Sequence, residues 1–263
     1  MLKVFIFLYL IINIFNNCLF AQDRVFNRTY QTNILPKNSI DIEYQTTSRL
    51  GRDNMFFHRL DQKLEFELGV IDNLQSSFYI LSESVTSGTN DLKTENVNGF
   101  ANAWKYKLSD PILDFIGSAL YAELTVFPKE VELETKLILD KRIGDNVILA
   151  FNAVYEKEFE FEYKEGSTEL EPESKLEFDL GFMHKITNNF SIGIEATNYN
   201  VISEDKGWEF STMYAGPSIN ITGKKWFLNL GFMPQIGNLK GDKKYILDEH
   251  ERIETRLIFS YNF

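Results

Sequence analysis

The sequence has little of what catalysis or covalent cross-linking requires. It contains one cysteine, Cys18, and three histidines among 263 residues. A lone cysteine cannot form a disulfide within the chain or build a cysteine metal site. No glycine-rich phosphate loop precedes a helical pattern, and no basic patch with interleaved aromatic residues is present. The sequence therefore predicts no metal and no cofactor.

Basic residues and long apolar runs are also scarce. Lys and Arg number 27 against 38 Asp and Glu, which gives a formal net charge of −11. Binding to nucleic-acid phosphates requires a surplus of positive charge, so nucleic acid is not an expected partner. After the first residues, no apolar run approaches the length of about 20 residues that a membrane-spanning helix needs.

The first residues have the composition of a secretory signal. Lys3 precedes an apolar run from Val4 to Phe15, and Ala21 is a small residue at the expected cleavage point. The run is too short for a spanning helix, and Cys18 is a poor lipoprotein cysteine because two asparagines precede it. We predict that residues 1–21 are a signal peptide cleaved near Ala21 and that the mature, exported chain has no cysteine.

The rest of the chain alternates apolar and polar residues with a period of two. In residues 63–70 and 175–182 the even positions are apolar and the odd positions are charged or glycine, and in residues 130–137 Val131, Leu133 and Leu137 alternate with charged residues. Such alternation is typical of a β-strand with one apolar face. We expect about twelve strands in residues 38–263, with residues 22–37 as a periplasmic N-terminal segment or short plug.

The final strand ends in an aromatic residue on its apolar parity. Phe259, Tyr261 and Phe263 share one face, and a strand of roughly 9–11 residues crosses a bilayer at a tilt. This pattern resembles the closing strand of bacterial outer-membrane β-barrels. The resemblance implies that these three residues form the signal that the barrel-assembly machinery recognises. It also implies that this strand pairs with the first strand near Ile40 and Ile42, which removes both sheet edges.

Short turns and longer polar connections alternate along the chain. The short turns contain Asp72-Asn73, Asp110-Pro111, Asp145-Asn146, Asn188-Asn189 and Gly223-Lys224, and the polar stretches 84–99, 156–173 and 237–250 are expected loops. Outer-membrane barrels have this asymmetry, with short periplasmic turns and longer extracellular loops. The predicted fold is therefore all-β, a transmembrane antiparallel up-and-down β-barrel of about 12 strands. A soluble two-sheet sandwich is the alternative, but it does not explain the signal, the terminal aromatic residue and the turns together.

Residues on the polar parity are expected to line the lumen. The candidates are Glu65, Glu67, Glu132, Glu134, Lys136, Glu177, Asp179, Glu195, Glu254 and Arg256. On this parity acidic residues outnumber basic ones by about three to one, and rings of carboxylates favour the passage of cations. Alternatively, pairs such as Lys136 with Glu134 and Lys175 with Glu177 could seal the lumen as a satisfied network.

Two enzyme classes use barrels of this kind. Outer-membrane phospholipases carry a serine two places after the catalytic histidine, but the three histidines here are followed by Leu60, Ile186 and Arg252. Outer-membrane aspartyl proteases use an Asp-x-His pair at the outer rim, a spacing that Asp248 and His250 reproduce without the second pair of aspartates. A rim hydrolase that uses these two residues is thus the minor alternative to a protein without enzymatic activity.

The sequence as a whole favours a passive pore or transporter for small cationic or neutral solutes. Its expected place is the outer membrane, in contact with lipid and lipopolysaccharide. A surface, adhesion or structural barrel that does not conduct remains the alternative. The acidic residues between 156 and 173 could bridge divalent cations among lipopolysaccharides, or they could form a solvated loop.

Overall fold

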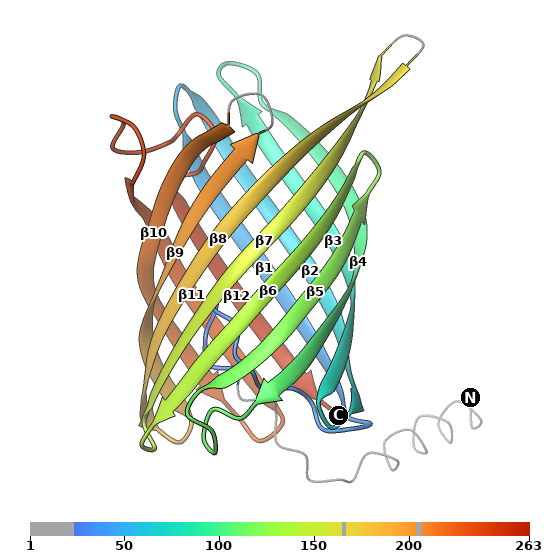
Figure 1. The fold of residues 1–263 in the computed structure, drawn as a ribbon. Coiled ribbons are helices and arrows are strands. Elements are labelled where there is room, and N and C mark those ends of the chain that lie inside the picture. The colour runs from blue at the N-terminus through green and yellow to red at the C-terminus, as the bar shows by residue number, and fades with distance from the viewer. Residues whose placement is uncertain (1–23, 165–166, 204–206) are drawn as a thin grey trace, which may run out of the picture.

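The computed structural model describes residues 24–164, 167–203 and 207–263, and the signal peptide expected at residues 1–21, with its Cys18, lies outside them. Within these described residues, twelve strands form one closed barrel (Figure 1). They are β1 (Ile40–Arg52), β2 (Met55–Ile71), β3 (Leu74–Gly88), β4 (Lys93–Ser109), β5 (Gly117–Phe127), β6 (Glu130–Ile143), β7 (Val147–Lys164), β8 (Ser167–Thr187), β9 (Phe190–Ser203), β10 (Gly207–Thr222), β11 (Trp226–Asn238) and β12 (Ile253–Asn262). The prediction of an all-β barrel of about twelve strands is confirmed.

The first and last strands close the barrel. Ile42 lies opposite Tyr261, and all pairs of neighbouring strands are antiparallel. Beyond the last pair, the Phe263 N–H donates to the Ile40 carbonyl at 3.1 Å. Among the described strands, the closed ladder leaves no edge unpaired. Within the described residues, no helix is long and apolar enough to cross a membrane.

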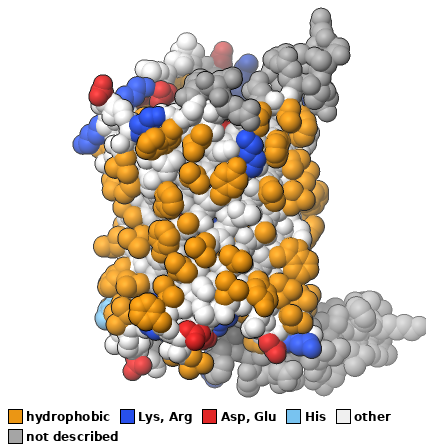
Figure 2. All heavy atoms as spheres, in the orientation of Figure 1, with side chains coloured by type: hydrophobic (Ala, Val, Ile, Leu, Met, Phe, Trp, Pro, Cys, Tyr) orange, Lys and Arg blue, Asp and Glu red, His pale blue; other side chains and the backbone are white. Residues whose placement is uncertain are grey.

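The barrel is apolar outside and polar inside. On β2, Phe66 and Leu68 are 38% and 43% exposed, whereas Glu65 and Glu67 are only 3% and 7% exposed. Figure 2 shows the outer wall covered by hydrophobic side chains, with charged side chains mainly near its two ends. A barrel in lipid requires this arrangement, because lipid-facing and lumen-facing residues alternate along every strand.

Several strands extend further than their composition indicates. The stretch 156–173, expected as a loop, is largely strand, because β7 continues to Lys164 and β8 begins at Ser167. Similarly, β3 and β4 cover most of the stretch 84–99. The alternation continues in these charged regions, since Phe159 and Phe161 keep the outer parity, and acidic residues on the inner parity do not end a strand.

The connection between β4 and β5 is longer than expected. The sequence predicts a strand from about residue 113, but β5 begins at Gly117, so that prediction is wrong. The Asp110 carboxylate accepts the N–H groups of Ile112 at 2.9 Å and Leu113 at 3.2 Å. An aspartate that binds the backbone ahead of it stabilises a turn, so these apolar residues are held out of the strand.

The N-terminal segment, residues 24–39, lies inside the barrel. Phe26 and Leu35 are fully buried, and Figure 1 shows this segment in blue within the lower part of the lumen. We call this end of the barrel the turn end. It carries the five connections β2–β3, β4–β5, β6–β7, β8–β9 and β10–β11, and we call the opposite end the loop end. The Asn38 N–H donates to the Gly69 carbonyl at 2.7 Å, close to the β2–β3 turn. The segment therefore fills the lumen from the turn end upward.

Candidate functional site

A cavity of about 510 Å³ occupies the lumen above the N-terminal segment. Strands β1, β2 and β12 line one side, and β5 to β10 line the other. The N-terminal segment contributes Arg28 and Tyr30, and the β11–β12 loop contributes Glu249, His250 and Glu251. The cavity is thus bounded by a wall of strands and by two segments that enter the lumen.

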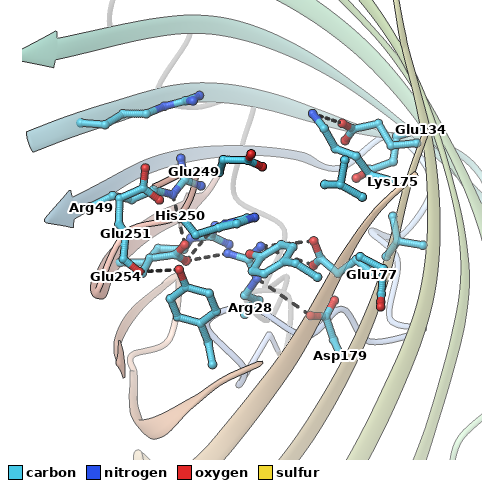
Figure 3. A pocket seen from close by; sticks show the side chains of 18 of the residues that line it. Arg28, Arg49, Glu134, Lys175, Glu177, Asp179, Glu249, His250, Glu251 and Glu254 are labelled. Atoms are coloured by element: carbon cyan, nitrogen blue, oxygen red, sulfur yellow. Dashed lines mark hydrogen bonds and ion pairs between the residues drawn. The ribbon is translucent and has the colours of Figure 1, made fainter. Parts of the chain in front are cut away.

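Arg28 connects the N-terminal segment to two separate strands of the wall, β8 and β12 (Figure 3). Its guanidinium lies 2.5 Å from the Glu254 carboxylate on β12 and 3.3 Å from Glu177 on β8, with Asp179 at 3.9 Å. The guanidinium also lies over the Tyr199 ring, 4.8 Å from its centroid. Because Arg28 is only 8% exposed, removal of a partner would leave a buried charge incompletely paired, which is strongly destabilising.

Glu195 of β9 binds the backbone of the same segment. The carboxylate accepts three consecutive N–H groups, from Asn27 at 2.8 Å and from Arg28 and Thr29 at 2.7 Å each. Glu195 is 1% exposed. Successive N–H groups that converge on one anion bind it strongly, because hydrogen bonds to a charged acceptor are stronger than hydrogen bonds between neutral groups. This carboxylate is therefore a principal attachment point of the segment.

Side chains of the wall also bind the segment's backbone further along. Asn152 accepts the Tyr30 N–H at 2.7 Å and donates to the Tyr30 carbonyl at 3.0 Å. Further along, Gln75 accepts the Leu35 N–H at 2.9 Å. Buried backbone groups need partners, and in this segment amides and carboxylates of the wall replace the partner strand of a sheet.

Aromatic rings fill the lumen beside the segment. The Tyr30 and Tyr121 rings lie 5.5 Å apart, and Lys136 places its ammonium 4.4 Å from the Tyr30 centroid. On the neighbouring wall, Lys63 lies 3.6 Å from the centroid of Tyr79. Such cation–π contacts are strongest where water is excluded. Together these groups pack on the β2–β6 side of the segment.

The β11–β12 loop, residues 239–252, folds into the lumen at the loop end. Gln235 accepts the Ile246 N–H at 2.8 Å and donates to the Ile246 carbonyl at 3.1 Å. The Tyr214 hydroxyl donates to the Glu251 carbonyl, and Arg52 pairs with the Glu251 carboxylate at 2.8 Å. These contacts hold the loop against β1, β10 and β11.

His250 of this loop is packed among aromatic rings. Its centroid lies 4.7 Å from Phe210 and 5.8 Å from Tyr199. Burial lowers the pKa of His250 to about 4, so the imidazole is neutral near pH 7. Asp248, by contrast, is half exposed and pairs with Lys243 at 2.7 Å, which lowers its pKa. Despite the Asp-x-His spacing, the two side chains therefore have different partners: Lys243 for Asp248 and aromatic rings for His250.

Six of the ten residues predicted to line the lumen lie at the cavity, and three others are buried elsewhere inside the barrel. Glu134, Lys136, Glu177, Asp179, Glu254 and Arg256 line the cavity, Glu195 binds the N-terminal segment, and the buried Glu65 and Glu67 lie near Arg24. Glu132 lies with Glu130 and Glu158, where three carboxylate oxygens come within 4.8 Å of one another. This trio could accept a cation, but Lys175 already pairs with Glu158.

Sequence reasoning missed several basic residues of the cavity. The sequence indicates a polar connection around Arg49 and Arg52, but β1 carries both into the lumen, and Arg28 enters with the N-terminal segment. As a result, the described residues that line the cavity include eight Arg or Lys residues and nine Asp or Glu residues. Lys175 also has other partners than the expected Glu177, since it pairs with Glu156 at 3.0 Å and with Glu158.

A closed twelve-stranded barrel with an apolar wall and a polar lumen is the fold of bacterial outer-membrane β-barrel proteins. Within this class, the chain belongs to the family described as a family of unknown function (DUF6662), whose model matches residues 19–263. No protein with curated annotation matches the chain.

Solved outer-membrane structures have the same fold. The COG4313 outer membrane channel from Pseudomonas putida F1 is similar with a TM-score of 0.64 at 10% identity, over 88% of this chain and 98% of that one. The NanC porin gives a TM-score of 0.53 at 10% identity, over 85% of this chain and 100% of that one. The translocator domain of the autotransporter NalP from Neisseria meningitidis gives 0.57 at 8% identity, over 86% and 88%. These likenesses establish the fold.

Proposed function

We propose that the protein is an outer-membrane pore for small solutes and that its own N-terminal segment closes the lumen in this conformation. The observation that carries the proposal is the position of residues 24–39, which fill the turn end of the lumen beneath an open, charged cavity. A structural or adhesive barrel would need no such cavity. The similarity to the Pseudomonas putida channel supports a pore.

Val25 and Phe26 pack in an apolar cluster with Ile148, Ala150 and Met183, and polar contacts hold the rest of the segment's attachment points. Glu195 and Asn152 bind its backbone, and Arg28 binds carboxylates on β8 and β12. Hydrogen bonds of this kind exchange readily with water, because each contributes only about 0.5–1.5 kcal/mol net, or roughly twice that when charged. A segment anchored in this way can leave the lumen without unfolding the barrel.

The preference for cations belongs to the open state. With the segment in place, the acidic and basic residues of the cavity nearly balance. Departure of the segment removes Arg24 and Arg28 and uncovers the carboxylates that they neutralise, including Glu43 and Glu177. Carboxylates that line a pore favour cations, so the open lumen selects cations or neutral solutes.

Planar-bilayer recordings test this function. The refolded chain without residues 24–35 should conduct more than the intact chain, because the barrel ladder remains complete. In a KCl gradient, the reversal potential of the shortened chain should lie nearer the equilibrium potential of K⁺ than that of Cl⁻. Equal conductance of the two proteins would exclude the segment as the closing element. If neither protein conducts although both migrate as folded barrels, the surface-barrel alternative is favoured.

A further inference from the structure

The β4–β5 turn carries an exposed apolar tip, which we define as Ile112, Leu113 and Phe115. Leu113 and Phe115 are 86% and 93% exposed, more than any other large hydrophobic side chain in the described part of the chain, and Ile112 is 60% exposed. The barrel core uses none of these side chains. Large apolar side chains displayed together on a surface mark an interaction site.

The other turns at the same end are polar. The β2–β3 turn consists of Asp72-Asn73, the β8–β9 turn of Asn188-Asn189, and the β10–β11 turn of residues 223–225, which are Gly-Lys-Lys. Such residues suit tight hairpins in water. The apolar tip is therefore a local feature of one turn, and chain reversal does not require it.

The backbone of this turn is fixed by its own side chains. Besides the two N–H groups held by Asp110, the Asp114 carboxylate accepts the Asp110 N–H at 2.8 Å. Lys107 donates to the Asp110 carboxylate at 2.7 Å, which keeps the pKa of Asp110 at about 2. Lys141 of β6 donates to the Asp114 carbonyl, also at 2.7 Å. A turn with satisfied polar groups presents its apolar side chains at little entropic cost on binding.

The apolar tip continues the outer wall of the barrel. Leu108 at the end of β4 is 54% exposed and Ile116 just before β5 is 38% exposed. Above them, Tyr106 and Leu120 lie opposite each other and are 45% and 50% exposed. The wall faces lipid in an outer-membrane barrel, so the apolar surface runs from the hydrocarbon region into the turn without interruption.

We propose that the apolar tip inserts into the periplasmic leaflet of the membrane and anchors this end of the barrel in lipid. The tip contacts the lipid interface, because its apolar surface is continuous with the lipid-facing wall. Lys141 flanks the turn on the outer parity of β6, where a basic side chain suits anionic lipid headgroups. The proposal rests on membrane placement of the barrel, and it does not depend on whether the lumen conducts.

Site-directed spin labelling tests the anchor. In a Cys18→Ser background, labels at Leu113→Cys and Phe115→Cys are compared in phospholipid vesicles for collision with oxygen, which concentrates in lipid, and with a water-soluble nickel chelate. Two controls bracket them. Leu124→Cys lies on the outer wall, 49% exposed, and reports lipid contact, whereas Asp145→Cys lies on the polar β6–β7 turn and reports water.

The anchor predicts that oxygen dominates at positions 113, 115 and 124, while the nickel chelate dominates at 145. Dominance of the nickel chelate at 113 and 115 would overturn the proposal, and protection from both reagents would overturn it in favour of a protein contact. If position 124 reports lipid while the tip does not, only the anchor fails. If position 124 reports water, the placement of the barrel in the membrane is wrong, and the proposed pore, which depends on that placement, fails as well.

Discussion

Phe26 lies against Gly181 of β8, at a place where a side chain on the wall would not fit. A β-carbon built at Gly181 would come within 2.6 Å of Cε1 of the Phe26 ring. The same relationship recurs on β11, where a β-carbon at Gly231 would approach Oδ1 of Asn27 to 2.6 Å. The wall is therefore shaped to receive the N-terminal segment at these two positions.

This fit gives the first prediction. Gly181→Leu should displace Phe26 and raise the conductance of the intact chain toward that of the chain without residues 24–35. The leucine fills space in the lumen and leaves the outward side chains of β8 unchanged. The expected gain is several-fold in open probability, measured in planar bilayers. Gly237→Ala is the control, because nothing lies within 4 Å of its added carbon.

The second prediction concerns Glu195. Glu195→Gln should weaken its hold on the N–H groups of Asn27, Arg28 and Thr29, because a neutral acceptor loses the charge-assisted part of each bond. The loss should be about 1.5–3 kcal/mol. Amide hydrogen exchange at residues 27–29 should accelerate on the order of ten- to a hundredfold. Glu83→Gln on β3, whose partner is Arg59, should not change this exchange.

Much of the fold follows from the sequence because period-two alternation and the terminal aromatic residue report on strand faces directly. The lumen is harder to predict. Alternation shows that Glu195 points inward, but only the folded barrel shows that the N–H groups of residues 27–29 donate to its carboxylate. Tyr199 illustrates the same limit, because nothing in its local sequence shows that its ring lies in the lumen beside Arg28. Contacts between segments far apart in the chain leave no local periodicity to recognise.

The third prediction tests the orientation of the wall. Phe178 is 42% exposed on the outer face of β8, and its ring stacks on Phe151 at 6.4 Å. Phe178→Arg should cost roughly 2–4 kcal/mol of folding free energy if the residue faces the middle of the bilayer. Folding titrations in lipid vesicles measure this cost, with Phe178→Leu as the matched control. Equal stability of the two variants would argue against lipid at this position.

The fourth prediction concerns assembly. Deletion of Phe263 removes the N–H donated to Ile40 and the ring packed on Tyr261 at 5.1 Å. The residue should also matter as part of the signal read by the barrel-assembly machinery, a role implied by resemblance to outer-membrane closing strands. The heat-modifiable form in outer-membrane fractions should fall after deletion. Unchanged amounts would show that the terminal aromatic residue is dispensable, and Phe263→Tyr should preserve them.

The last prediction uses the pH dependence of the β11–β12 loop. The pKa of His250 is lowered to about 4, mainly by burial, while nearby Glu251 opposes the shift and Arg52, Arg49 and Lys175 add to it. An undocked loop exposes the imidazole, whose pKa then lies near 6.5. Protons are therefore taken up on undocking between these values, so docking is strongest above about pH 6.5 and weakens as the pH falls toward 4.

His250→Phe keeps an aromatic ring in place and removes the titrating group, so it should remove this part of the pH dependence. Histidine NMR spectra of the refolded protein should contain one resonance with a midpoint near pH 4 that is absent from the variant. Hydrogen exchange at Ile246, whose N–H is bound by Gln235, should accelerate between pH 6.5 and 4 in the intact protein after correction for intrinsic rates. A His250 midpoint near 6.5 would mean that the ring is solvated and that the loop does not fold into the lumen.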